Sequence, residues 1–223
     1  MSELVGAIIV SAGLSTRMQG IDKSGFQIDG VPLLVHTARV FQFTTAIDEI
    51  SLVVREDQIL SIQQLIEEYS LTKVKAVCIG GKTRRDSVKI GLESLSSVSW
   101  IVVHDGARPL VTKDLIIQGL DMAKKTGAST AGIPLKDTLK TVSSKSMVVE
   151  TLDRNSIVLV QTPQTFRREI LEKAHQEFSG EAVDDAVMVE KLGIPVFVYP
   201  GLNSNIKITT PEDLKFLKVL MKG

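Results

Sequence analysis

Three short loops in this sequence combine small residues with charged ones, a mixture suited to binding phosphate. The first contains Ser11, Ala12 and Gly13 and is followed by two cations, Arg17 and Lys23. Small side chains let backbone N–H groups approach phosphate oxygens, and fixed cations neutralise the phosphate charge. The Gly-x-Gly-x-x-Gly and Walker patterns are both absent from this loop. The loop therefore predicts either a polyphosphate site or an ordinary strand-to-helix turn.

The second loop begins at Gly80-Gly81 and runs into a predicted helix. The glycines let backbone approach a flat ring, and Ser87 can donate a hydrogen bond. An arginine such as Arg84 in a first helical turn opposes the helix dipole unless an anion lies nearby. The alternative interpretation is a solvated, basic start of a helix.

The third loop is His104-Asp-Gly-Ala-Arg-Pro109, at the end of a predicted buried strand. An aspartate there suits Mg²⁺, which prefers one or two carboxylates together with phosphate oxygens. Arg108 either pairs with Asp105 or holds a phosphate. For His104, a hydrogen-bonded position in the strand is a better interpretation than a role as ligand or base.

Cations outnumber candidate bases in these loops. Three further cations, Lys136, Arg154 and Lys207, lie in the second half of the chain, and Lys207 could equally be an exposed strand residue between isoleucines. No Ser-His-Asp pattern, catalytic cysteine or carboxylate pair stands out. This balance favours phosphoryl or nucleotidyl transfer, which depends mostly on positioning and charge stabilisation.

Apolar runs that alternate with amphipathic segments must position these loops. Predicted strands cover residues 5–10, 50–54, 74–79, 100–104, 128–133, 157–160 and 196–199. Predicted helices cover residues 31–43, 58–69, 84–95, 113–124, 167–178, 184–191 and 211–221. This alternation predicts an α/β fold with a mostly parallel sheet. Ligands of such sheets bind at the carboxyl ends of the strands, where all three loops fall.

The region after residue 134 departs from this alternation. Residues 139–142 and 147–152 predict two strands around a polar turn, and the resulting arm of about residues 136–156 is expected to project from the domain. Residues 157–160 predict a core strand followed by a turn at 162–165, and residues 205–208 predict one more strand. Asp184-Asp185 predicts a helix cap.

Composition sets wider limits on the protein. With 223 residues, 43% of them hydrophobic, the chain is long enough for a single large α/β domain or at most two small ones, and we expect one domain over residues 1–223. A net charge of +0 provides no general attraction for nucleic acid or an acidic membrane, and no apolar run is long enough to span one. The single cysteine, Cys78, excludes an internal disulfide and is expected to be a buried strand residue. A cytoplasmic protein is expected, or a plastid protein if a transit peptide has been removed.

Taken together, the motifs resemble the 2-C-methyl-D-erythritol 4-phosphate cytidylyltransferase family of the non-mevalonate isoprenoid pathway. The resemblance runs nearly end to end. It rests on Ser11-Ala-Gly-x-x-x-Arg17-Met18, Gly80-Gly81-x-x-Arg84-x-Asp86-Ser87, His104-Asp-Gly-Ala-Arg-Pro109, Lys136-Asp-Thr138, Asp153-Arg-Asn155, Thr162-Pro-Gln164 and Asn205-Ile-Lys-x-Thr209-x-Pro-Glu-Asp213.

The resemblance implies a Rossmann-like three-layer nucleotidyltransferase fold and a homodimer formed through the arm. It implies that CTP and methylerythritol 4-phosphate give the CDP-linked alcohol and pyrophosphate, with Mg²⁺ or another divalent cation. We expect in-line attack by the acceptor phosphate on the α-phosphorus without a covalent intermediate, because no credible nucleophile is present.

Residue roles follow from the same resemblance. Arg17 and Lys23 are expected to hold the triphosphate, and Lys207 to contact the α-phosphate and the acceptor. Asp105 is expected to bind the metal. Residues expected to bind the substrates in the same chain are Ser11, Ala12, Gly13, Gly80, Asp86, Ser87, Ala107, Arg108 and Thr162. Thr138 and Arg154 are expected to reach the acceptor phosphate from the partner's arm.

One stretch departs from the family. The family usually has Pro-Lys-Gln after the arginine loop, whereas this chain has Asp22, Lys23 and Ser24 in a loop one residue shorter. This departure leaves open a non-catalytic nucleotide-binding regulator. A cytidylyltransferase for another polyol phosphate, such as ribitol 5-phosphate, would share the same core motifs. Guanylyl- and molybdopterin-type transferases fit the Asp105 and Asn205 motifs poorly.

Overall fold

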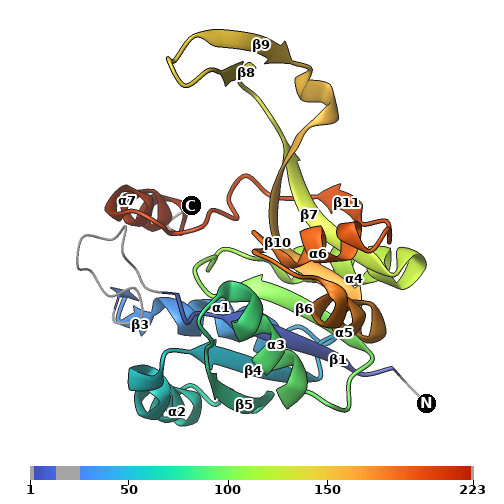
Figure 1. Ribbon diagram of the computed structural model, residues 1–223. Helices are drawn as coiled ribbons and strands as arrows, with labels where there is room; N and C mark the ends of the chain where they lie inside the picture. Colours follow the sequence, from blue (N-terminus) through green and yellow to red (C-terminus); the bar gives the residue numbers. More distant parts are fainter. Residues whose placement is uncertain (1–2, 14–25, 222–223) are drawn as a thin grey trace.

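The computed structural model describes residues 3–13 and 26–221, and a seven-stranded sheet lies at its centre (Figure 1). The strand order is β11-β7-β10-β6-β1-β4-β5. The strands are β1 (Val5–Val10), β4 (Glu49–Val54), β5 (Val74–Ile79), β6 (Trp100–Asp105), β7 (Ala128–Pro134), β10 (Val158–Arg167) and β11 (Phe197–Pro200). β10 runs antiparallel to β6 and β7, and the other neighbouring pairs of this sheet are parallel. The predicted mostly parallel α/β sheet is confirmed.

Helices cover both faces of the sheet. They are α1 (Leu33–Gln42), α2 (Ile59–Glu68), α3 (Arg84–Ser94), α4 (Lys113–Thr126), α5 (Arg168–Glu177) and α6 (Asp185–Lys191). A further helix, α7 (Pro211–Leu220), packs in a separate cluster with Ile28 and Leu33. Successive side chains of a strand point to opposite faces, so Ala7 and Ile9 of β1 join a core with α1, α2 and α4. Ile8 between them joins a second core with α3, α5 and α6. The result is the three-layer arrangement expected from the resemblance.

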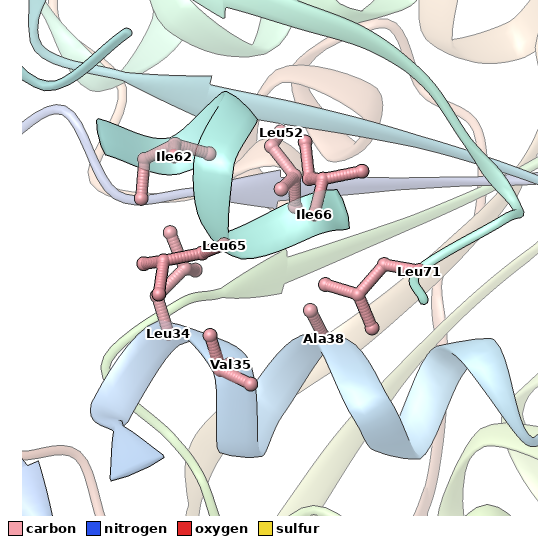
Figure 2. Close-up of a pocket in the computed structure, with 8 residues that line it drawn as sticks. All are labelled: Leu34, Val35, Ala38, Leu52, Ile62, Leu65, Ile66 and Leu71. Atoms are coloured by element: carbon pink, nitrogen blue, oxygen red, sulfur yellow. The ribbon is translucent and has the colours of Figure 1, made fainter. Parts of the chain in front are cut away.

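The core under α1 and α2 contains a small cavity with aliphatic walls (Figure 2). Its lining residues come from α1, α2, β4 and the segment after α2: Leu34, Val35, Ala38, Leu52, Ile62, Leu65, Ile66 and Leu71. No polar or charged side chain is among them, so this cavity is a feature of core packing. A charged substrate would find no hydrogen-bond partner there.

The predicted arm is present and projects from the sheet at the top of Figure 1. β8 (Leu139–Val142) pairs antiparallel with β9 (Val148–Leu152), and a 3₁₀ turn, η3 (Arg154–Ser156), follows. Several apolar side chains of the arm are exposed to solvent: Val142, Met147, Val148 and Val149. These residues contribute nothing to the core of their own chain.

Small elements change the boundaries of two predicted helices. Residues 31 and 32 were expected to begin a helix, but β3 (Val31–Pro32) pairs with β2 (Gln27–Ile28), and α1 begins at Leu33. The extended backbone of Pro32 makes it the residue before the helix. The 3₁₀ turn η2 (Glu56–Gln58) likewise precedes α2.

The strand expected at residues 157–160 is present from Val158 as the start of β10, but its place in the core and the turn after it were wrong. Val158, Leu159 and Val160 begin β10, and between 39% and 50% of each residue is exposed. Thr162 and Pro163, joined by a cis peptide bond, lie within β10, where the pairing with β7 shifts register between Val160 and Gln164. An irregularity inside one long strand replaces the predicted turn.

Two smaller expectations also differ from the structure. Residues 205–208 form no strand; the backbone N–H of Ile208 instead donates to the carbonyl of Ala107 at 2.8 Å. Cys78 is only partly buried, because β5 is an edge strand of the sheet. Among the described residues, no helix has the length and apolar character needed to cross a membrane.

Candidate functional site

The three predicted loops meet at one edge of the sheet, around the carboxyl end of β1. The backbone N–H of Ser11 donates to Val53 on β4 at 2.7 Å, and that of Gly106 donates to Val10 at 2.8 Å. From β1 the chain proceeds to β4 and β5 on one side, and then to β6 on the other. The loops therefore surround a topological switch point, the place where open α/β sheets bind ligands.

Glycine at position 80 allows two of these loops to touch. A Cβ atom at Gly80 would lie 2.2 Å from the Cβ of Ala12 and 3.0 Å from the hydroxyl of Ser87. A Cβ at Gly81 would lie 2.3 Å from the Cβ of Asp86. Such distances are sterically forbidden, so any larger residue would push the loops apart. The structure thus brings Ala12, Gly80, Asp86 and Ser87 together, as the sequence predicted.

Hydrogen bonds within the second loop fix its shape. Asp86 and Thr83 form a capping box at the start of α3: the Asp86 N–H donates to the Thr83 hydroxyl at 3.1 Å, and the Thr83 N–H donates to the Asp86 carboxylate at 3.0 Å. The Ser87 hydroxyl donates to the Thr83 carbonyl at 3.0 Å and accepts from the Gly81 N–H at 3.1 Å. Both side chains therefore shape the glycine turn.

Asp105, at the end of β6, is the centre of the charged site. Its side chain is 9% exposed, and its oxygens lie 2.8 Å from Lys207 Nζ, 3.4 Å from Arg84 Nε and 3.4 Å from Arg108 Nε. Burial alone would raise the pKa of Asp105, but these three cations outweigh it and hold the pKa below its ordinary value. The carboxyl group is therefore ionised and surrounded by positive charge.

A chain of buried hydrogen bonds holds the backbone of Asp105 in place. The Asp105 N–H donates to the Thr162 hydroxyl at 3.1 Å, which lies 3.0 Å from Nδ1 of His104. Nε2 of His104 lies 3.1 Å from the carbonyl of Arg108, which can only accept, so Nε2 carries the proton and Thr162 donates to Nδ1. Burial lowers the pKa of His104 to about 4. His104 is thus neutral and hydrogen-bonded, as predicted.

The segment that carries Lys207 is fixed by Asn205, whose role the sequence analysis did not identify. Asn205 is fully buried, and its amide donates to the carbonyl of Thr162 at 2.8 Å. The backbone carbonyl of Asn205 accepts a hydrogen bond from Nη1 of Arg108 at 2.7 Å. These bonds bring a segment remote in sequence against the loop after β6. An asparagine side chain before an Ile-Lys-Ile run gives no local signal of such long-range bonds.

A second carboxylate, on Asp185, was also missed. Asp184 caps α6, accepting from the Val187 N–H at 3.0 Å as predicted, but Asp185 is fully buried and lies 2.6 Å from Nη1 of Arg84. Burial alone would lower the pKa of Arg84, but the negative charges of Asp185 and Asp105 outweigh burial, so the pKa lies above its ordinary value. The unfavourable placement of Arg84 at a helix start was the sequence signal for a nearby anion.

Four predicted site residues are not among the described members of this cluster. Arg17 and Lys23 are outside the described residues. Thr138 and Arg154 belong to the arm, where Nη1 of Arg154 donates to the carbonyl of Lys136 at 2.5 Å. The arm projects away from the sheet within its own chain (Figure 1).

The donor set suits a metal ion that also binds a nucleotide. Within residues 3–13 and 26–221, no group of three or more His, Cys, Asp or Glu side chains could enclose an ion. Asp105 offers one ionised carboxylate at the edge of the sheet. Mg²⁺ is commonly bound by one or two carboxylates, with waters and phosphate oxygens completing its octahedron. The residues present fit Mg²⁺ bound together with a triphosphate.

Comparison with known sequences covers the whole chain. A family model described as IspD, 2-C-methyl-D-erythritol 4-phosphate cytidylyltransferase, matches residues 5–222. A protein of that name from Dehalococcoides mccartyi (strain CBDB1) is 48% identical over 222 residues, covering 100% of this chain and 98% of the relative. One from Syntrophus aciditrophicus (strain SB) is 42% identical over 228 residues, covering 100% and 97%.

Solved structures agree with the sequence comparison. The 4-diphosphocytidyl-2C-methyl-D-erythritol synthase of Anaerococcus prevotii DSM 20548 superposes with a TM-score of 0.89 at 28% identity, covering 99% of this chain and 97% of that one. The 2-C-methyl-D-erythritol 4-phosphate cytidylyltransferase of Thermus thermophilus gives a TM-score of 0.81 at 30% identity, covering 100% of both chains. The chain therefore belongs to the 2-C-methyl-D-erythritol 4-phosphate cytidylyltransferase family.

Proposed function

We propose that this protein transfers the cytidylyl group of CTP to 2-C-methyl-D-erythritol 4-phosphate, giving 4-diphosphocytidyl-2-C-methyl-D-erythritol and pyrophosphate. Family membership supports this reaction. The observation that assigns the reaction to this site is the ionised Asp105 carboxylate, which lies among three cations at the switch point of the sheet. That arrangement suits a metal-bound triphosphate.

The cytidine and triphosphate are assigned to the two small-residue loops. Ser11, Ala12 and Gly13 present backbone to the phosphates, and Arg17 and Lys23, outside the described residues, neutralise them. Gly80, Asp86 of the α3 capping box and the adjacent Ser87 form the other side of the nucleotide pocket together with Ala107. The direct contact between Ala12 and the position of Gly80 supports a single pocket built from both loops.

Asp105 is the proposed ligand of Mg²⁺ or another divalent cation. When bound there, the ion would neutralise phosphate oxygens and draw charge from the leaving pyrophosphate. Lys207 is suited to the substrate side because its side chain is 40% exposed, whereas that of Arg108 is 12% exposed. We assign Lys207 to the α-phosphate and the acceptor, and Arg108 to holding the loop.

The proposed chemistry is one in-line displacement. An oxygen of the acceptor phosphate attacks the α-phosphorus of CTP, a new O–P bond forms, and the bond from the α-phosphorus to the bridging oxygen breaks, releasing pyrophosphate. Arg17, Lys23 and Lys207 stabilise the pentacoordinate transition state. Trapping of a covalent cytidylyl-protein after incubation with α-labelled CTP alone would contradict this route.

The acceptor end of the site is assigned to two chains. We propose a homodimer in which the arm, about residues 136–156, extends from the single catalytic domain of each chain toward its partner. Thr138 and Arg154 of the partner's arm then hold the acceptor phosphate, with Thr162 supporting that end. The exposed valines of the arm support this assignment, because an interface would bury them.

The decisive experiment is a pyrophosphate-release assay with CTP, Mg²⁺ and one polyol phosphate at a time. Release with methylerythritol 4-phosphate and at most slow release with ribitol 5-phosphate is expected. The reverse preference would support a cytidylyltransferase for another polyol phosphate. CTP binding without release from either acceptor would support a nucleotide-binding regulator instead.

A further inference from the structure

Arg84 lies between two buried carboxylates, and the two contacts differ in length. Nη1 of Arg84 is 2.6 Å from Asp185 Oδ2, whereas Nε is 3.4 Å from Asp105 Oδ1. The Asp185 side chain is fully buried, while that of Asp105 is 9% exposed. Arg84 is therefore held more closely by the deeper carboxylate than by the one at the edge of the site.

The position of Asp185 is fixed by its backbone. Oε1 of Gln164 on β10 accepts from the N–H groups of Asp185 and Ala186, both at 3.2 Å. The amide of the same glutamine donates to Asp184 at 2.8 Å. The first turn of α6 is thus clamped to the sheet, which keeps the backbone of Asp185 in place if Arg84 moves.

Arg84 and Asp185 could each form a further hydrogen bond. Among the described residues, Nη2 of Arg84 and Oδ1 of Asp185 are buried without a hydrogen-bond partner. Nε2 of His175 lies 3.8 Å from that oxygen. An arginine with an unused N–H group can form a bidentate pair with a carboxylate, which is its strongest arrangement. Arg84 would gain such a pair at Asp105 if Asp185 did not retain it.

We infer that Asp185 is a positioning residue that holds Arg84 partly away from Asp105, so that Asp105 Oδ1 stays available to a divalent cation. The inference rests on the proposed role of Asp105 as the metal ligand. Without Asp185, the whole charge of Arg84 would be directed at Asp105 and would compete with the cation there. Asp185 thereby influences metal binding without touching the metal.

The test compares CTP binding with and without metal. Calorimetry gives the dissociation constant of the protein for the Mn²⁺–CTP complex and for CTP in EDTA, and their ratio is the metal preference. In D185N the preference should fall about 10-fold, within the range of interaction energies between residues of one charge network. Affinity for CTP in EDTA should stay within about 2-fold of the parent protein, a smaller change than that network effect.

Two further variants make the result specific. The double variant R84Q/D185N removes the competing cation together with its partner, so its metal preference should return to the parent value or exceed it. E190Q changes an exposed acid near the end of the same helix, outside the Gln164 clamp, and should leave both the melting temperature and the metal preference unchanged. Circular dichroism confirms that each variant is folded.

Each outcome has a defined meaning. An unchanged preference in folded D185N, or a preference that stays low in R84Q/D185N, would overturn the inference. A parallel loss of affinity for both forms of CTP would show a merely structural role of Asp185 and would overturn the inference too.

If the parent protein shows no metal preference, the proposed metal role of Asp105 is wrong, and the inference is wrong with it. If D185N does not fold, the double variant against the parent decides the question: a lower preference overturns the inference, and an equal or higher one supports it.

Discussion

The Asp105 cluster and the arm differ in how much of their surroundings one chain provides. Asp105 is enclosed by cations from α3, the loop after β6 and the segment before α7, and a neutral histidine supports it from behind. The arm has the opposite character, since Val142, Met147, Val148 and Val149 are exposed. The first region has its described charged partners within one chain, and the second exposes apolar side chains to solvent. We expect changes at Asp105 to act within one chain and changes on the arm to act across two.

The largest effect is expected at Asp105 itself. D105N keeps the shape of the side chain but removes the charge that binds the cation, so kcat/KM should fall about 10³-fold, the upper range for loss of one electrostatic group. Pyrophosphate release at saturating Mg²⁺ measures it. D121N, at an exposed position of α4, is the matched control and should retain full activity. A loss below about 10-fold, far under the usual effect of such a group, would remove Asp105 from the centre of the site.

The next effect tests whether the arm serves the partner. R154A should lower kcat/KM about 10²-fold through a higher KM for the acceptor, because a phosphate loses its charged partner, with CTP binding unchanged. Mixing R154A with D105N after subunit exchange should restore roughly a quarter of the parent activity, since half of the dimers then contain one intact site. No recovery after proven exchange would mean that Arg154 acts in its own chain.

A smaller effect is expected on the arm surface. V149D places a charge on an exposed apolar residue and should weaken the dimer about 10- to 100-fold if that surface is buried on association. Sedimentation velocity over a range of concentrations measures the shift. K145A, in the turn of the arm, is the control and should leave association unchanged. An unaltered V149D dimer would show that association uses another surface.

The smallest effect concerns acid stability near the Asp105 cluster. Burial lowers the pKa of His175 to about 4, below an unfolded value near 6.5. The neutral imidazole therefore contributes its full stabilisation above about pH 6.5, and this contribution is lost as the pH falls toward 4. Through His175, the free energy of unfolding should fall by about 2 kcal/mol between pH 7 and pH 5. Urea unfolding followed by the fluorescence of the single tryptophan, Trp100, measures the loss. H175N should lose less stability than the parent over that interval, and an equal loss would contradict the assignment.

Local patterns in the sequence predicted much of the fold. The bounds of β1 and β5 are those expected. In β1 a continuous apolar run specifies a buried parallel strand. The three loops converge as expected, because the carboxyl ends of parallel strands share an edge. The arm was predicted from the change of pattern after residue 134.

The errors have two physical causes. The run from Val158 to Val160 has the composition of a core strand, but burial depends on what covers a surface, and the described part of the chain leaves these residues 39% to 50% exposed. Asp185 follows a capping aspartate, so its local sequence indicates a helix start. Its real partner, Arg84, is 101 residues away, and no local period predicts a contact of that range.

The ion pairs around Asp105 have a consequence for the response of the protein to salt. Lys207, Arg84 and Arg108 already share two internal carboxylates, Asp105 and Asp185, so fewer condensed solution ions surround them than would surround three unpaired cations. An incoming triphosphate exchanges with a carboxylate for these partners and releases few counterions to the solvent. The KM for CTP should accordingly depend on ionic strength less steeply than the number of cations in the site would suggest.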